Sequence, residues 1–174
     1  MNDKTHDQTR DPTQPAGADS SVGQATQQAS FQIEKIYIKD LSLEVPNAPQ
    51  VFMEVENPQL EIQVRNEGAQ FAEALFEVIV TVTVTARSGE KTVFLAEVAQ
   101  AGIFAVRGVP VEDLDPLLGI ACPTILYPYA REAISDLVTR AGFPAVLLAP
   151  VSFEQIYMQR RQQSEAEPKI ELTN

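Results

Sequence analysis

The sequence predicts an α+β fold, because strand patterns in its first half are followed by helical patterns in its second half. Residues 74–85 alternate between apolar and polar side chains, which is typical of a half-buried strand. Beyond residue 116, apolar side chains recur at helical spacing between prolines. The chain has 174 residues and is 44% hydrophobic, so it can bury one sizeable core and is expected to form a single domain.

Four strands are expected in the first half. Residues 31–45 form the first, and its apolar side chains fall into two phases. One phase holds Phe31, Ile33, Tyr37, Leu41, Leu43 and Val45, and the other holds Ile36 and Ile38. Both faces of this strand are therefore expected to be partly covered. Residues 59–65 form a shorter strand, and residues 74–85 and 91–100 form a hairpin through a turn at 87–90.

These strands are predicted to form a four-stranded antiparallel sheet, a meander with a long crossover loop. Parallel pairing would need crossover helices, which this half lacks. The helices should pack on one side of the sheet. An apolar stripe predicts one helix that ends at Gly142, and its members are Leu126, Ala130, Ala133, Ile134, Leu137, Val138 and Ala141. A last helix is expected to start near Val151 with Ser152 as its cap.

Both ends of the chain are polar. Residues 1–30 carry hardly any large apolar side chain and are expected to be a disordered tail, because they cannot bury enough surface to offset the entropy of ordering. Residues 162–174 are expected to be a flexible polar tail. The folded domain is therefore predicted to span residues 31–161.

The charge and the apolar runs exclude several classes of protein. The net charge of −11 argues against nucleic-acid binding, which needs a concentrated excess of lysine and arginine, and it would complement a basic partner. Solubility is the simpler explanation of the same charge. No apolar run is long enough to span a bilayer and the N-terminus does not resemble a signal peptide, so no membrane insertion and a cytoplasmic location are expected. The single cysteine excludes an intrachain disulfide and fits a reducing compartment.

A search for catalytic groups finds little. The one histidine, His6, lies in the polar tail, and Cys122 has no basic neighbour in sequence, so Cys122 is expected to be a small buried side chain. The chain has no glycine-rich phosphate loop, so ATP hydrolysis is not expected. Carboxylate pairs such as Glu112 and Asp113 lack the ligand pattern of a calcium loop. No enzyme activity, cofactor or metal is predicted.

The second hairpin strand is apolar on both faces, since Val93 and Leu95 alternate with Phe94 and Ala96. A small protein rarely leaves such a surface exposed without using it. Oligomer contacts or a binding groove are therefore expected there, and a fully covered core strand is the alternative.

Several separated segments then resemble one family. They are residues 119–134 (Gly-Ile-Ala-Cys-Pro-Thr-Ile-Leu-Tyr-Pro-Tyr-Ala-Arg-Glu-Ala-Ile), residues 140–144 (Arg-Ala-Gly-Phe-Pro), residues 148–153 (Leu-Ala-Pro-Val-Ser-Phe), and the segments 31–40, 45–52 and 102–104. Together they closely resemble the SecB protein-export chaperones over about residues 31–157. The resemblance implies an ATP-independent chaperone that holds unfolded precursor proteins in a translocation-competent state and delivers them to the SecA motor for Sec-dependent export.

The resemblance also implies a homotetramer, a dimer of dimers, with Ala96, Val98 and Gln100 at subunit contacts. It implies SecA binding by Asp40, Glu44, Leu95 and Glu97. The first two are four residues apart, so they share one face of a regular strand. An ordinary polar sheet face is the alternative reading of these positions.

The family's groove for unfolded polypeptide is expected at Val51, Phe52, Phe153 and Tyr157. Recognition there would need no sequence-specific contact, because aromatic pockets accept any bulky side chain. Tyr127 and Tyr129 lie near the same loops, but their helical spacing favours a place in the core. A family tryptophan falls on Glu56 in this chain, so the depth of the groove is expected to differ.

Three other functions remain open from the sequence, of which an enzyme is the least supported. A SecB-like chaperone could serve a toxin–antitoxin pair, with one dedicated client. A carrier of small hydrophobic ligands would need a closed pocket.

Overall fold

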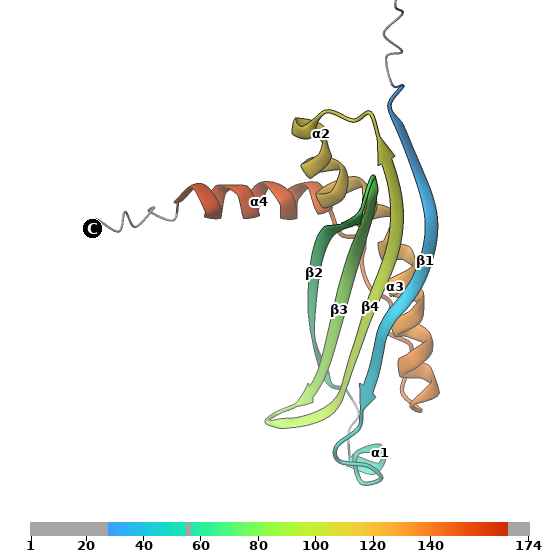
Figure 1. Ribbon diagram of the computed structural model, residues 1–174. Coiled ribbons are helices and arrows are strands. Elements are labelled where there is room, and N and C mark those ends of the chain that lie inside the picture. The colour runs from blue at the N-terminus through green and yellow to red at the C-terminus, as the bar shows by residue number, and fades with distance from the viewer. Residues whose placement is uncertain (1–27, 55–56, 167–174) are drawn as a thin grey trace, which may run out of the picture.

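The computed structural model describes residues 28–54 and 57–166. Its elements are β1 (Ser30–Glu44), α1 (Val51–Glu54), β2 (Gln59–Ala72), β3 (Leu75–Ser88), β4 (Lys91–Arg107), α2 (Val111–Pro116), the π-helix η1 (Leu117–Ala121), α3 (Cys122–Arg140) and α4 (Phe153–Ala166). Apart from the single-turn helix α1, all four strands precede the helices, which confirms the predicted α+β class (Figure 1). The expected tail over residues 1–30 lies almost wholly outside the described residues, as do His6, Glu56 and residues 167–174.

The four strands form one antiparallel sheet in the order β1-β4-β3-β2. The last three strands are a meander, as predicted, because short turns join them. β1 does not lie next to β2. α1, in the connection that follows β1, lies beyond one end of the sheet, and β1 pairs with β4 at the edge opposite β2 (Figure 1).

The strands are longer than predicted. β2 extends to Ala72 and β4 to Arg107, so β3 and β4 pair over their whole length from the turn at Gly89 and Glu90. Gly89 has a positive φ of 57°, which suits a two-residue hairpin turn. The alternation predicted for β3 is confirmed, because Val78, Val80, Val82 and Val84 are all buried on one face.

The side chains of β1 do not follow the two phases predicted from the sequence. The strand carries two register shifts, between Ile33 and Lys35 and between Ile38 and Asp40. Each shift inserts one residue and reverses the alternation of the side chains. The pairing with β4 therefore puts six apolar side chains on one face, namely Phe31, Ile33, Ile36, Ile38, Leu41 and Leu43, and moves Tyr37 to the other.

α3 packs on one face of the sheet, called here the helix face, mainly over β4 and β3. Figure 1 shows α3 behind the sheet and α4 projecting away from it. The predicted stripe forms the contact, since Leu126, Ala130, Ile134 and Val138 are fully buried. The opposite face of the sheet, the open face, is not covered by α3.

The helix ends match the sequence signals. α3 stops at Arg140, and Gly142 has a φ of 90° while its N–H bonds to the carbonyl of Thr139 at 3.0 Å. α4 starts at Phe153, and the Ser152 hydroxyl accepts a hydrogen bond from the Gln155 N–H at 3.3 Å. α4 continues to Ala166, five residues past the expected domain end at 161.

Candidate functional site

The four predicted SecA-binding residues lie together on the open face of β1 and β4. In the antiparallel register, Glu44 lies opposite Leu95, Ser42 opposite Glu97, and Asp40 opposite Ala99. Directly opposite residues share a face and have close Cβ atoms. Three carboxylates and one leucine therefore occupy three successive rows of the sheet, which we call the acidic patch (Asp40, Glu44, Leu95 and Glu97).

Two residues that the sequence reasoning missed position Glu97. The Thr83 hydroxyl donates to Glu97 Oε2 at 2.6 Å, and Arg65 Nη2 lies 3.9 Å from the same oxygen. Thr83 is the direct partner of Glu97 across β3 and β4. The alternating threonines of residues 81–85 indicated that Thr83 lies on the polar face of its strand. No sequence pattern indicated Arg65, because only the pairing of β2 with β3 brings it close to Glu97.

A second polar group lies further along the open face. Glu77 accepts hydrogen bonds from Lys39 Nζ, at 2.6 Å, and from the Tyr37 hydroxyl. The hydrogen bond from Lys39, as the larger cause, and the one from Tyr37 hold the pKa of Glu77 below its ordinary value. The hydrogen bond to Glu77 is also the main cause that raises the pKa of Tyr37 to about 12. Lys39 is therefore engaged by Glu77 beside the acidic patch.

The predicted groove residues separate into two clusters. Phe52 is about half exposed, at 49%, and the centre of its ring lies 5.2 Å from that of Phe143 in a tilted arrangement. The ring centre of Phe143 lies 4.9 Å from that of Phe94. Val51 is buried beside them. Phe52 is thus the member of this cluster, called the aromatic cluster, that a ligand can reach.

The other two predicted groove residues lie at the start of α4. Phe153 is buried at 2% exposure against the edge of Tyr127, whose hydroxyl donates to the carbonyl of Ala149 at 2.8 Å. Tyr157 is partly buried and donates to Asp115 at 2.6 Å, and this bond is the main cause that raises the pKa of Tyr157. Val51 and Phe153 are therefore buried supports of the two clusters. Phe52 and Tyr157 are the predicted groove residues that a client could contact.

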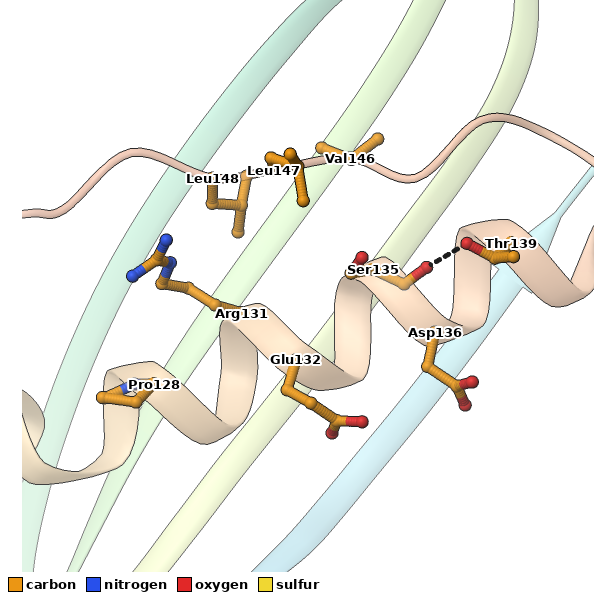
Figure 2. Close-up of a pocket in the computed structure, with 9 residues that line it drawn as sticks. All are labelled: Pro128, Arg131, Glu132, Ser135, Asp136, Thr139, Val146, Leu147 and Leu148. Atoms are coloured by element: carbon orange, nitrogen blue, oxygen red, sulfur yellow. Dashed lines mark hydrogen bonds between the residues drawn. The ribbon is translucent and has the colours of Figure 1, made fainter.

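The segment 143–152 runs between these two clusters, over α3. Together with α3 it lines an open hollow of about 450 Å³ (Figure 2). Val146 and Leu148 are buried, whereas Leu147 between them is 85% exposed. Arg131 lines the same hollow, and its guanidinium lies 5.9 Å from the centre of the Tyr127 ring. The buried side chains of Val146 and Leu148 thus hold the segment against the domain, and the side chain of Leu147 points into solvent.

The three expected oligomer residues lie on the helix face and are buried within the single chain. Ala96 and Val98 belong to the core cluster that includes α3 residues, and Gln100 donates from Nε2 to the carbonyl of Tyr37 at 2.8 Å. They do not reach the surface of the protomer. A role in assembly stays a prediction, and it would act through the position of α3.

The remaining candidates have no catalytic setting. Cys122 is fully buried at the start of α3, and burial raises the pKa of its thiol to about 12, which makes the reactive thiolate rare near neutral pH. Among the described residues, no three His, Cys, Asp or Glu side chains are grouped to hold a metal ion. No helix in the described part of the chain is long and apolar enough to cross a membrane.

The comparisons with known proteins agree with this arrangement. The family model described as "Preprotein translocase subunit SecB" matches residues 24–164. The chain belongs to the SecB family. A protein-export protein SecB from Chromobacterium violaceum is 63% identical over 140 residues, which cover 80% of this chain and 93% of that protein. Another from Methylobacillus flagellatus is 57% identical over 146 residues, which cover 84% of this chain and 93% of that protein.

The function of the chain is that of a SecB chaperone in protein export. A solved structure supports the fold as well. The SecB-like chaperone of Mycobacterium tuberculosis, in complex with a peptide from an antitoxin, matches with a TM-score of 0.58 and 20% identity, over 70% of this chain and 91% of that chain.

Proposed function

We propose that this SecB-family chain works without ATP, holds unfolded precursor proteins and hands them to the SecA motor. The observation that carries the proposal is the separation of two surfaces on one sheet. The acidic patch lies on the open face, whereas Phe52, Leu147 and Tyr157 lie around the helix layer. A client and a second partner can therefore bind without competing for the same residues.

The acidic patch fits a basic partner segment. Its carboxylates lie within three rows, so a flexible basic tail could meet several of them at once, and Leu95 in the first row would add an apolar contact. Opposite charges speed encounter and make it sensitive to salt. A basic segment of SecA would meet both requirements, and we propose that SecA docks here through such a segment.

The apolar side chains fit an unfolded client. Such a client exposes bulky side chains in no fixed order, and separate weak sites on one chaperone gain affinity when one long chain engages several of them. A homotetramer, a dimer of dimers, would multiply these sites. Folding of the client would withdraw its segments, so slow-folding precursors would be held longest.

The first test is light scattering of a slow-folding secretory precursor diluted from denaturant, with the assembled protein and without ATP. We expect stoichiometric protein to suppress aggregation of the unfolded precursor and to ignore its folded form. No suppression at any ratio would overturn the proposal and favour a dedicated client, as in a toxin–antitoxin pair. The relatives that are 63% and 57% identical are protein-export proteins, which favours export over a dedicated client.

A second test separates the two surfaces. The triple variant Asp40→Lys, Glu44→Lys and Glu97→Lys should weaken SecA association about tenfold or more and leave client capture nearly unchanged. The matched control is Glu34→Lys, Glu73→Lys and Glu90→Lys, which changes the net charge equally at exposed positions elsewhere. Equal loss of both activities in the first variant would mean that the acidic patch is structural.

A further inference from the structure

We infer that Arg65 weakens the binding of a basic partner to the acidic patch, because its guanidinium already lies beside the carboxylate of Glu97. Arg65 is thus an internal competitor of the basic segment proposed above. The inference rests on the proposed function and names a residue that regulates the same surface. Loss of Arg65 should tighten SecA association, whereas loss of a carboxylate of the patch should weaken it.

The strand register puts Arg65 on the open face, next to the row that holds Glu97. Arg65 lies opposite Thr81, which lies opposite Ala99 on β4, and directly opposite residues share a face. Glu97 lies opposite Thr83, one row further along the same strand pair. Because β3 lies between β2 and β4, it separates Arg65 from Glu97 in the sheet (Figure 1).

Small side chains on β3 let Arg65 reach across this strand. Two strand spacings, about 10 Å, separate β2 from β4. Thr81 and Thr83 lie between these strands on the open face, and a threonine extends much less far from the sheet than an arginine. Arg65 can therefore extend over them, and its Nη2 lies 3.9 Å from Glu97 Oε2.

Arg65 supplies charge to Glu97 without fixing the carboxylate in place. A separation of 3.9 Å is longer than a hydrogen bond, whereas the Thr83 hydroxyl donates to the same oxygen at 2.6 Å. The side chain of Arg65 is 70% exposed and that of Glu97 is 34% exposed. Ion pairs this exposed add little to folding stability. Thr83 therefore orients Glu97, and Arg65 can move away without loss of the fold.

Lys39, another cation beside the patch, has a different partner. Lys39 Nζ lies 2.6 Å from Glu77, a carboxylate that is not part of the patch. This pair is neutral as a whole and leaves the three carboxylates of the patch free of Lys39. Arg65, in contrast, is paired with one of those three carboxylates, Glu97. Of these two cations, Arg65 is therefore the one that competes directly with a basic partner.

Another carboxylate can accept Arg65 once a partner has displaced it. Glu67 is two residues from Arg65 on β2, so both side chains lie on the open face. An open hollow of about 300 Å³ is lined by Arg65, Asn66, Glu67, Thr81 and Arg160. Arg65 can therefore swing from Glu97 toward Glu67 and leave the patch to the partner.

This competition lowers the affinity of the patch without blocking it. A segment with several cations can engage Asp40 and Glu44 as well as Glu97, and it can contact Leu95. Several contacts made by one segment outcompete a single arginine. The affinity for SecA is then lower than the carboxylates alone would give, which suits a chaperone that must separate from SecA after each delivery.

The test is isothermal titration calorimetry of purified SecA with the full-length assembled protein. Arg65→Gln should bind SecA about two to five times more tightly than the wild type at about 50 mM salt, and this gain should shrink at about 500 mM salt because salt screens the charges. Arg107→Gln is the matched control, because it removes the same charge from an exposed position at the end of β4. The control should change the affinity by less than about 1.5-fold.

A double-mutant cycle shows whether Arg65 acts through Glu97. In the Glu97→Gln background, Arg65→Gln should leave the affinity for SecA nearly unchanged, because the carboxylate for which the two cations compete is gone. Arg65→Lys keeps the charge and should bind SecA about as tightly as the wild type does.

The outcomes separate the inference from the proposed function. If SecA binds the wild type, Arg65→Gln and Arg107→Gln equally well, the inference is overturned and the proposed function stands. An equal gain with and without Glu97 also overturns the inference, because net charge would then explain it. The same holds if Arg65→Lys gains as much as Arg65→Gln, because the charge would then play no part. If the wild type does not bind SecA, the proposed docking and the inference both fail.

Discussion

Glu97 shows how single residues shape the acidic patch. Its carboxylate is held by Thr83 and approached by Arg65, so one of the four predicted SecA-binding residues is oriented by neighbours from two other strands. A positioned carboxylate loses less entropy when a basic partner binds. The residues that matter on this face therefore extend beyond those that the sequence identified.

Gly102 lies where the core admits no additional atom. A Cβ at this position would lie 2.8 Å from Phe104 Cε2 and 2.9 Å from Leu126 Cδ2. Gly102→Ala should destabilise the fold by about 1–3 kcal/mol, measured by urea denaturation, because these two fully buried side chains must move. The control is Gly68→Ala, whose Cβ would meet its nearest neighbour at 3.4 Å and should change stability by less than about 1 kcal/mol. Similar losses in both variants would contradict this account.

Glu77 should make stability depend on pH. Hydrogen bonds from Lys39 and Tyr37 lower its pKa from the ordinary value of 4.5. A lowered folded-state pKa stabilises the protein above the unfolded-state pKa, and this stabilisation is lost as the pH falls through the folded-state pKa. Glu77→Gln should therefore cost about 1 kcal/mol at neutral pH, and its difference in melting temperature from the wild type should shrink below about pH 4.5. A difference that stays constant down to about pH 3, or one shared by Glu90→Gln, would argue against this role.

At the scale of elements, the two bulges of β1 adapt one strand to two environments. Without them, alternation would put Ile36 and Ile38 on the face opposite Phe31, Leu41 and Leu43. With them, the apolar side chains face the helix layer and Tyr37 reaches Glu77 on the open face. The strand thus serves the core and the polar surface at once.

α4 is joined to the domain by its first two turns. Phe153 packs on Tyr127, Tyr157 donates to Asp115, and Arg160 donates to Asn66. Gly119 allows the ring of Tyr157 to approach, since a Cβ there would lie 2.8 Å from it. The rest of α4 projects away from the sheet (Figure 1). These contacts set the direction of the helix.

Removing one of these contacts should loosen α4 and leave the core unchanged. Arg160→Ala is expected to raise hydrogen exchange severalfold in α4 and at Asn66, with a change in overall stability below about 1 kcal/mol, because local opening needs less free energy than global unfolding. Gln159→Ala, an exposed neighbour on the same helix, is the control. Unchanged exchange in Arg160→Ala would mean that Phe153 and Tyr157 alone hold the helix.

At the scale of the whole molecule, the proposed tetramer should depend on the packing of the core around Ala96 and Val98. Both are fully buried on the helix face, so they can affect assembly only by moving what packs on them. Ala96→Leu should shift α3 and convert tetramers to dimers in sedimentation velocity, while circular dichroism stays that of a folded protein. Ala99→Leu, on the open face, should leave assembly unchanged. If both variants dissociated the tetramer equally, the position of α3 would not explain the effect on assembly.

The sequence alone carries the elements of this fold, because hydrophobic periodicity, the Gly142 stop and the Ser152 cap act over a few residues. It also placed Asp40 and Glu44 on one face and identified the family through its motifs. It could not show that β1 pairs with β4, because strand order depends on where a long connection crosses the sheet. Nor could it separate exposed Phe52 from buried Val51, or bring Arg65 to Glu97. These depend on pairing register and on which strands α3 covers, since long-range packing decides them and neighbouring residues do not.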